Sequence, residues 1–400
     1  MKKKILFVIN TLSRAGAEMA LLSLLRRLDP EKLDISLFVL TGQGELAREL
    51  PGYVHVCNKA IRGESVLCAG GRRQLARTVL KAMLCRGTGV RKLPFLISQT
   101  AAMVSRGSFS PEKLLWPVVA EGTPGPEDSY DLAVAYLEGG SAYYVANRVN
   151  AKKKAAFLHI DYRQAGYNRK LDGDCYLKFD RIFTVSQEIQ APFLEEYPEL
   201  RDRVEVFHNI LDVQRIFRLS KEPGGFPGDF DGWKILTVSR LTAQKALEIS
   251  VDAMKLLKDA GVKARWYVLG EGDQRPFLEN RIRQLGLQRE FLLVGAVDNP
   301  YPWFAQTDLY VQCSRYEGWG IAVQEARLLG CPVLASDCSG IREQLEGGET
   351  GRLCQLSPAA IADNIRSLLA DPAQRKRLGQ EASRQCLNQQ TELHKLYALL

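Results

Sequence analysis

Paired cysteines and long hydrophobic runs are missing from this 400-residue sequence, and each absence excludes a class of protein. The nine cysteines are an odd number, and no two of them form a C-x-x-C pair. A disulfide framework or a structural zinc site is therefore not expected, and the cysteine pattern favours a reducing cytosol.

The N-terminus also lacks a hydrophobic run long enough for a signal peptide or a membrane-spanning helix. After Met1 and three lysines, the apolar run extends only from Ile5 to Ile9. This run is shorter than the core of a signal peptide and far shorter than the roughly 20 residues that cross a bilayer. We therefore expect a first strand here, and a cytoplasmic protein.

Two cofactor motifs are missing as well. The segment after the first strand reads NTLSRAGAE and lacks the G-x-G-x-x-G pattern of dinucleotide-binding enzymes, which argues against a dehydrogenase. No D-x-D motif follows a suitable strand, because Asp172-Gly173-Asp174 is expected in a polar turn of the first domain. We therefore expect neither a metal ion nor another bound cofactor.

Basic charge is what the sequence has in excess, with a formal net charge of +8. Residues 60–115 hold ten Lys and Arg against two Glu, and they include the apolar run 93–97. This pattern is typical of a solvated helix face and also of a surface that meets an anionic membrane or an acidic acceptor. Both interpretations stay open, whereas nucleic acid is disfavoured because no recognition motif accompanies the charge.

Continuous apolar runs separated by helix-length segments predict an α/β protein whose parallel sheets are covered on both faces. The basic segment interrupts the first series of runs and predicts extra helices inserted between two strands. In the first half the runs are 4–10, 34–40, 54–58, 131–137, 155–160, 181–186 and 204–209. In the second half they are 234–239, 264–270, 291–297, 308–314, 331–336 and 351–356.

A stretch rich in Gly, Pro and Asp separates the two series, and the chain is too long for one ordinary hydrophobic core. We predict a first Rossmann-like domain at 1–218, a linker at 219–233 and a second Rossmann-like domain at 234–385. Residues 386–400 are expected to form a C-terminal helix that packs back on the first domain. The binding site is expected between the domains, at the carboxyl ends of the strands.

The densest chemistry lies between Ser314 and Ser336, where Glu317 and Glu325 flank a Gly-Trp-Gly turn and the start of an apolar helix. Glycines let the backbone approach a ligand, and the free N–H groups of a helix start attract phosphate. The glutamates are eight positions apart. That is about 12 Å along a helix, whereas glycosidase carboxylates lie about 5–9.5 Å apart. We therefore expect them to contact separate parts of one ligand.

This segment resembles the signature of retaining glycosyltransferases of family 4 (glycosyl transferases group 1), which have the GT-B fold. The similar features are E-G-x-G, the second glutamate and the following A-x-x-L-G-x-P-V-L-A-S. Four further segments resemble the family in the same order. They are INTLSRAGAEMALLSLL, similar to its GGAE start; Val238–Met254, similar to GRL-x-x-x-K-G; Val268–Glu279, similar to G-x-G-x-x-x-x-x-L; and 291–318, which leads into the glutamates.

The resemblance implies roles for residues at matching positions. Arg240 and Lys245 would neutralise the diphosphate of a nucleotide sugar. Glu317 would contact the transferred sugar, Glu325 would bind the ribose hydroxyls, and His159 would contact donor or acceptor from the end of a strand. The chain departs from the family at Ala15, where glycine is usual. Further implied substrate-binding positions are Gly16, Gly270, Gly295, Val297, Gly318, Trp319, Gly320 and Ile321.

The predicted activity is retaining transfer of a sugar from a nucleoside diphosphate sugar, in the first place a UDP-sugar, to a hydroxyl of a glycan or glycolipid. The resemblance implies cell-surface polysaccharide synthesis in a bacterium, by a cytoplasmic enzyme peripheral to the inner face of the membrane. The alternatives are a nucleotide-sugar epimerase or hydrolase on the same fold, and a non-catalytic binding protein. Intact charged residues at the matching positions argue against the last of these.

Overall fold

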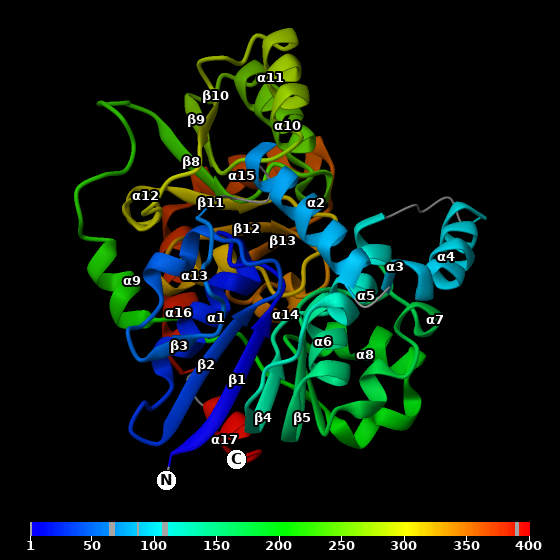
Figure 1. Cartoon of the computed structure of the whole chain (residues 1–400). Coiled ribbons are helices and arrows are strands. Elements are labelled where there is room, and N and C mark those ends of the chain that lie inside the picture. The colour runs from blue at the N-terminus through cyan, green and yellow to red at the C-terminus, as the bar shows by residue number, and fades with distance from the viewer. Residues whose placement is uncertain (1, 64–68, 86–87, 106–110, 389–391) are drawn as a thin grey trace. The chain divides into compact units, whose positions relative to one another are not determined.

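The computed structural model describes residues 2–63, 69–85, 88–105, 111–388 and 392–400. The chain divides into two compact units, each an α/β body built on a parallel sheet (Figure 1). The first unit contains Met1–Ile210 and Glu392–Leu400, and the second contains Leu211–Thr391. The predicted α/β class with two Rossmann-like domains is confirmed.

The first unit contains a seven-stranded sheet in the order β3-β2-β1-β4-β5-β6-β7, with parallel neighbours throughout. The central strand β1 is the predicted N-terminal strand, and its residues Ile5–Ile9 are fully buried. The order reverses between β1 and β4, which makes the carboxyl ends of these two strands a topological switch point. The strands are β1 (Lys3–Ile9), β2 (Leu33–Val39), β3 (Val54–Val56), β4 (Ser129–Ala135), β5 (Asn150–Leu158), β6 (Arg181–Thr184) and β7 (Val204–Val206).

The basic segment between β3 and β4 folds as helices, as the sequence predicts. They are α2 (Ala69–Leu84), α3 (Thr88–Arg91), α4 (Leu93–Ser105) and α5 (Pro111–Gly122). The other helices of this unit are α1 (Gly16–Arg27), α6 (Gly140–Arg148), α7 (Arg169–Asp172), α8 (Gln187–Glu196) and α17 (Leu393–Tyr397), with short 3₁₀ turns η1 (Glu45–Glu49), η3 (Cys175–Lys178) and η4 (Pro198–Arg203).

The second unit contains a six-stranded parallel sheet in the order β10-β9-β8-β11-β12-β13. Its order reverses between β8 and β11, so this sheet also has a switch point. The strands are β8 (Trp233–Val238), β9 (Ala264–Leu269), β10 (Phe291–Gly295), β11 (Leu309–Gln312), β12 (Val333–Ser336) and β13 (Arg352–Cys354). The helices are α9 (Val213–Leu219), α10 (Leu247–Asp259), α11 (Arg275–Gln284), α12 (Tyr301–Gln306), α13 (Ile321–Leu328), α14 (Ile341–Gln344), α15 (Pro358–Ala370) and α16 (Pro372–Asn388), with 3₁₀ turns η5 (Ala243–Lys245) and η6 (Glu346–Gly348).

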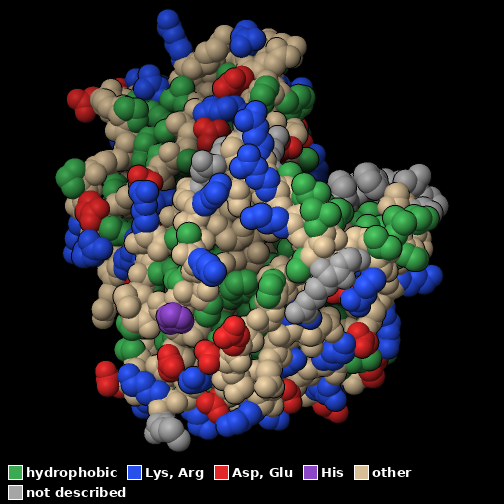
Figure 2. Space-filling view, viewed as in Figure 1, with side chains coloured by type: hydrophobic (Ala, Val, Ile, Leu, Met, Phe, Trp, Pro, Cys, Tyr) green, Lys and Arg blue, Asp and Glu red, His purple; other side chains and the backbone are tan. Residues whose placement is uncertain are grey.

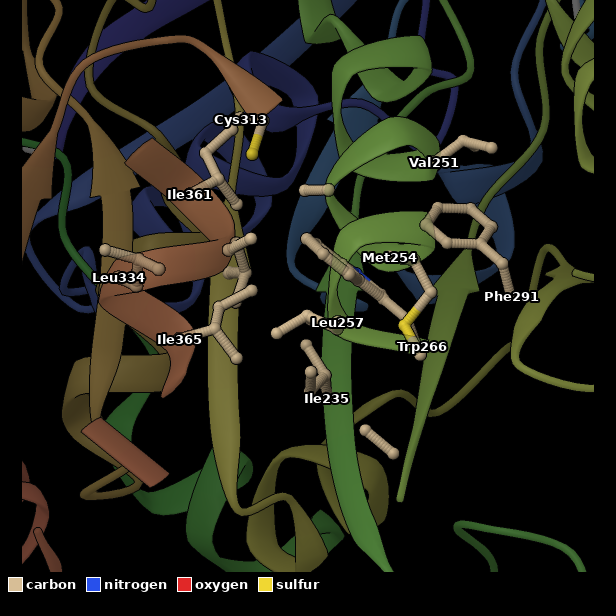
Figure 3. Packing of buried hydrophobic residues seen from close by; sticks show 14 of the residues in the cluster. Ile235, Val251, Met254, Leu257, Trp266, Phe291, Cys313, Leu334, Ile361 and Ile365 are labelled. Atoms are coloured by element: carbon tan, nitrogen blue, oxygen red, sulfur yellow. The ribbon is translucent and has the colours of Figure 1, made fainter. Parts of the chain in front are cut away.

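Helices cover both faces of the second sheet, because its strands are apolar on both sides. On one face, α10 and α15 pack on Ile235, Trp266 and Leu334, as Figure 3 shows from close by. On the other face, α9, α12 and α13 pack on Leu236, Tyr267 and neighbouring strand residues. Full burial of one such side chain stabilises the fold by about 1.5–3 kcal/mol.

The two units divide at positions that differ from the predicted ones. The second unit begins at Leu211, because Ile216 and Leu219 of α9 belong to its core. The predicted linker, 219–233, also packs on this unit, since the Phe226 ring contacts Tyr267 and Trp303.

The last nine residues belong to the first unit, while α16 belongs to the second. The Asp29 backbone N–H donates to the Tyr397 hydroxyl at 3.0 Å. The Lys395 ammonium donates to the Val206 carbonyl at 2.6 Å. These bonds attach Glu392–Leu400 to the first unit.

Over the described residues, no helix combines the length and the apolar character needed to cross a bilayer.

Candidate functional site

The residues singled out by the sequence gather at the switch point of the second sheet. Strands β8 and β11 are parallel neighbours, and Tyr310 pairs with Leu236. The loop after β8 carries Arg240 and Lys245, and the loop after β11 carries Glu317. Ligands of open parallel sheets bind at such carboxyl edges, where the neighbouring loops diverge.

Lys245 and Glu317 form an ion pair across this switch point. The Lys245 ammonium donates to Glu317 Oε1 at 2.5 Å, and the two side chains are 13% and 6% exposed. The Ser314 hydroxyl donates to the same carboxylate oxygen at 2.7 Å, and the Gln312 amide does so at 3.4 Å. A buried carboxylate persists where a cation and further donors compensate its lost hydration, and Glu317 has both.

The turn that carries Lys245 is fastened to the loop that carries Glu317. The Arg315 backbone N–H donates to the Gln244 carbonyl at 2.9 Å, and the Gln244 amide donates to the Tyr316 carbonyl at 2.9 Å. The Arg315 guanidinium donates to the Ala243 carbonyl and to Glu248. These bonds fix the backbone on both sides of the ion pair.

The next residue, Ala246, has an unusual backbone conformation. It is buried and left-handed, with φ +47° and ψ +36°. Only glycine adopts this region without steric cost. The G-R-L-x-x-x-K-G segment that this stretch resembles has glycine at this position, which is the residue that the left-handed conformation favours.

Helix α13 begins in the glycine turn. Gly320 is left-handed at φ +77°, and its carbonyl accepts from the backbone N–H groups of Val323 and Gln324 at 2.9 and 3.1 Å. A Cβ on Gly340 would lie 2.2 Å from the Gly318 carbonyl oxygen, so the two backbones touch there. The Gln344 amide donates to the Trp319 carbonyl at 2.5 Å. The start of α13 is therefore held rigidly by α14, with Ile321 as its first residue.

Glu325 lies on α13 in a second, separate polar environment. It is 7% exposed, and the Tyr301 hydroxyl donates to its Oε1 at 2.8 Å. Burial raises the pKa of this carboxyl to about 7, against the opposing effects of the Tyr301 hydrogen bond and the positive charge of Arg215. Glu325 and Glu317 thus have different partners, which fits two glutamates that act on different parts of a ligand.

The remaining predicted residues of this unit line the same edge of the sheet. Arg240 is exposed directly after β8. Gly270 follows β9 with φ +140°, and a Cβ there would lie 2.0 Å from the Ser239 carbonyl oxygen. Its N–H donates to the carbonyl of Gly295, which ends β10 at φ +97°. Val297 is half-buried against the core of the unit.

Three residues of this site were missed by the sequence reasoning. Gln312 and Ser314 are buried and donate to Glu317, and Tyr301 donates to Glu325. Two polar residues at alternate positions of an otherwise apolar strand are the signal for the first two. Side chains two positions apart point to the same side of a strand. Gln312 and Ser314 therefore both face the Glu317 carboxylate.

In the first unit, two predicted residues lie after β1 and β5, the two strands on either side of β4. Gly16 is exposed and is the first residue of α1, after β1. His159 directly follows β5, and its backbone N–H donates to Glu138 Oε2 at 3.0 Å. Burial lowers the pKa of His159 to about 3, so the imidazole is neutral near pH 7. Its Nε2 is shielded from solvent and has no hydrogen-bond partner among the described residues.

The prediction of a polar turn at Asp172-Gly173-Asp174 is wrong for its first residue. Asp172 is 6% exposed, and the hydroxyls of Tyr143 and Tyr162 donate to its two oxygens. Burial raises the pKa of this carboxyl to about 6, although the hydrogen bonds oppose the shift. The Asn168 side chain caps the start of α7, and Asp172 ends this helix with its carboxylate against the tyrosine hydroxyls.

A cavity of about 510 Å³ borders Asp172 in the first unit. Its wall includes Arg91 and Lys92 from the basic helices and Tyr143, Arg148 and Lys170 from the surrounding elements. Across the described ranges, His, Cys, Asp and Glu form no group of three that could hold a metal ion. Independence from a metal therefore stays a prediction.

Comparisons with known proteins show which families this chain is similar to. Residues 226–385, which include the ion pair and Glu325, match the family model of glycosyl transferases group 1. The alpha-D-kanosaminyltransferase of Streptomyces kanamyceticus is 30% identical over 152 residues, 37% of this chain and 39% of that protein.

A Campylobacter jejuni relative is 26% identical over 211 residues, 52% of this chain and 56% of its own length. It is the N-acetylgalactosamine-N,N'-diacetylbacillosaminyl-diphospho-undecaprenol 4-alpha-N-acetylgalactosaminyltransferase. The chain thus spans about half the length of the curated relatives it matches, or less.

Among solved structures, Anabaena HepE in complex with UDP and glucose is similar over 100% of both chains. The TM-score is 0.69 and the identity is 17%. This likeness shows the fold, which is the GT-B arrangement of two Rossmann-like domains with parallel sheets.

Proposed function

We propose that this chain is a retaining glycosyltransferase of family 4 that transfers a sugar from a UDP-sugar to a hydroxyl of a glycan or glycolipid. The observation that carries the proposal is the buried Lys245–Glu317 pair at the switch point of the second sheet, beside the start of α13. The match of residues 226–385 to glycosyl transferases group 1 supports the class of reaction.

The residue roles in this proposal are those that the resemblance to family 4 implies. Lys245, Arg240 and the N–H groups around Gly318–Ile321 would neutralise the diphosphate. Glu317 would accept hydrogen bonds from the transferred sugar, and Glu325 would accept them from the ribose hydroxyls. The base would lie beside Gly270, Gly295 and Val297.

Transfer would occur on one face of the sugar. The bond from the anomeric carbon to the diphosphate oxygen breaks, a bond to the acceptor oxygen forms, and the acceptor proton passes to the departing phosphate oxygen. The cations stabilise the negative charge that develops on the leaving group. Gly16 and His159 of the first unit would contact substrate, with His159 as a neutral hydrogen-bonding group. No metal ion has a part in this scheme.

The acceptor is proposed to be a cell-surface glycan or its lipid-linked precursor, handled at the cytoplasmic side of a bacterial membrane. The Campylobacter relative supports this class, because its name describes transfer to a sugar on diphospho-undecaprenol. The HepE complex with UDP and glucose supports a UDP-sugar as donor.

A screen of nucleotide sugars by thermal shift would identify the donor, since a ligand at 100 times its Kd stabilises the folded state by about 2.7 kcal/mol. Transfer would then be measured with glycan and glycolipid acceptors. Retention requires that NMR of the product shows the anomeric configuration of the donor.

Lys245→Ala and Glu317→Ala should each lower the transfer rate by about 10²–10³-fold, because each removes a charged group aimed at the reacting centre. Lys255→Ala is the matched control, since Lys255 pairs with Asp259 on the exposed face of α10. Near wild-type turnover in either site variant would overturn the assignment. UDP release without any acceptor, as fast as transfer, would favour a hydrolase, and a changed sugar still bound to UDP would favour an epimerase.

A further inference from the structure

Exposed hydrophobic side chains are concentrated in one short part of the first unit. Ten large hydrophobic residues are exposed over the described ranges, and half of them lie between positions 80 and 97. Folded proteins rarely expose neighbouring large apolar side chains unless these meet a partner. The five residues, with their exposed fractions, are Leu80 (57%), Leu84 (75%), Val90 (78%), Leu93 (52%) and Ile97 (62%).

Helix α2 presents leucine and basic residues on the same face. Its exposed residues recur with the spacing of one helical face, and the opposite side packs on α5. The helix therefore offers a mixed stripe of cations and leucines. Members of this exposed face are Arg73, Ala76, Arg77, Leu80, Lys81 and Leu84.

The following helices continue the pattern. Arg91 and Lys92 each lie 2.9 Å from the Glu121 carboxylate of α5, so this segment is fastened to the body of the unit. Beside these ion pairs, Val90, Leu93 and Ile97 are exposed. Figure 2 shows the basic side chains along α2 and a group of hydrophobic side chains over α4.

We propose that this exposed face of α2, α3 and α4, defined by Arg73, Arg77, Leu80, Lys81, Leu84, Val90, Leu93 and Ile97, binds the surface of an anionic lipid bilayer. Leucine and isoleucine enter the boundary between headgroups and acyl chains, and the long stems of Arg and Lys reach the phosphates from the same depth. An anionic bilayer is the partner that fits this face, because its negative headgroups complement the cations and its acyl chains complement the apolar side chains between them.

The cavity next to α3 and α4 does not extend this basic face, because Glu121, Asp172 and Asp174 line it together with Arg91, Lys92, Arg148 and Lys170. The proposal concerns the first unit alone and holds whether or not the proposed sugar transfer is found.

Flotation of the full chain with liposomes tests the proposal. Vesicles of phosphatidylcholine with about one third phosphatidylglycerol should bind the protein at low salt, and pure phosphatidylcholine should bind it weakly. Raising the salt concentration should weaken binding, because the screening length falls to about 8 Å near 0.15 M. The combined variant Arg73→Gln, Arg77→Gln, Lys81→Gln should lose roughly 100-fold in partitioning, about fivefold for each cation removed.

A matched variant separates a local surface from the general positive charge of the protein. Arg283→Gln, Lys376→Gln, Arg377→Gln removes three exposed cations of the second unit and should bind vesicles as the wild type does. Leu80→Ser with Leu84→Ser should also weaken binding, whereas Leu256→Ser with Phe277→Ser, exposed residues of the second unit, should not. Circular dichroism and thermal melting check that each variant is folded.

Three outcomes would overturn the proposal. The first is absence of binding to anionic vesicles even at low salt. The second is an equal loss of binding in the α2 variant and in its matched control. The third is a dimer in sedimentation velocity that Leu80→Ser with Leu84→Ser abolishes while vesicle binding is unchanged, because the face would then be covered by a second copy of the chain.

Discussion

The two units each bury a carboxylate against tyrosine hydroxyls, but they do so to different degrees. Asp172 in the first unit accepts from Tyr143 at one oxygen and from Tyr162 at the other. Glu325 in the second unit accepts from Tyr301 at Oε1 alone, as far as the described side chains show. Burial raises the pKa of both carboxyls, to about 6 for Asp172 and about 7 for Glu325.

The difference separates a structural carboxylate from one with remaining capacity to bind. Both oxygens of Asp172 already have partners from its own unit, so a ligand would have to displace a buried hydrogen bond. Glu325 has a second oxygen to offer, and it lies on the helix that begins at the glycine turn. A raised pKa is common to both and therefore does not identify the binding residue. The number of hydrogen bonds that each carboxylate already accepts is what supports Glu325 as the proposed binding residue.

The contrast between the two carboxylates should appear most directly in nucleotide binding. Glu325→Gln should weaken UDP affinity by about 10–100-fold, because hydrogen bonds to a charged group contribute about 1.5–3 kcal/mol. Asp172→Asn makes the same change from carboxylate to amide in the first unit, and it should leave UDP affinity unchanged. Isothermal titration calorimetry at pH 8 measures both. Equal UDP affinities of the two variants would contradict the proposed difference between the carboxylates.

The pH dependence of the free energy of unfolding should show the raised pKa that the two carboxylates share. The folded-state pKa of Glu325 is about 7 against an ordinary 4.5, so the folded protein holds this proton more tightly than the unfolded chain. The free energy of unfolding therefore falls as the pH rises from about 4.5 through about 7, because Glu325 ionises. At pH 8 the loss is about 3 kcal/mol.

Glu325→Gln should consequently gain stability relative to the wild type between pH 5 and pH 8, when no ligand is bound. Asp172→Asn should show a similar gain over a lower window, from its ordinary value of 3.8 to about 6. Thermal unfolding followed by calorimetry at several pH values resolves both. A difference between variant and wild type that does not change with pH would contradict the raised pKa of that group.

The smallest effect should come from backbone strain, which also distinguishes the units. Ala246 and Glu346 are the described non-glycine residues with positive φ, and both lie in the second unit. Ala246→Gly should raise the free energy of unfolding by about 1 kcal/mol, because the left-handed conformation costs a side-chain-bearing residue about 1–2 kcal/mol. Ala260→Gly, where φ is −81°, is the control and should give no gain. A destabilised Ala246→Gly would show that the methyl group has a packing role larger than its strain.

Much of this fold could be predicted from the sequence, because parallel strands buried on both faces read as continuous apolar runs. Every strand of both sheets falls on a predicted run, with ends that differ by a few residues. The unit boundaries were less predictable. Gly and Pro near 219–233 mark turns, but a turn does not reveal that Phe226 packs between Tyr267 and Trp303.

The site was predicted in part for a related reason. Local motifs mark Lys245 and Glu317 separately, but their pairing over 72 positions depends on β8 and β11 being neighbours. Strand order is a long-range property that a single sequence does not display. The partners Gln312, Ser314 and Tyr301 were missed for the same reason, since each acts through a contact rather than through a motif.

The hydrogen bonds that hold the Lys245 turn have a consequence for the affinity of ligand binding. A lysine side chain carries roughly 2 kcal/mol of rotamer entropy, which is normally lost when a ligand immobilises it. Here Glu317 holds the ammonium before any ligand arrives, and Arg315 holds the turn that carries it. Folding has already removed that freedom, so the site is preorganised and the proposed diphosphate would meet a cation that is already in place.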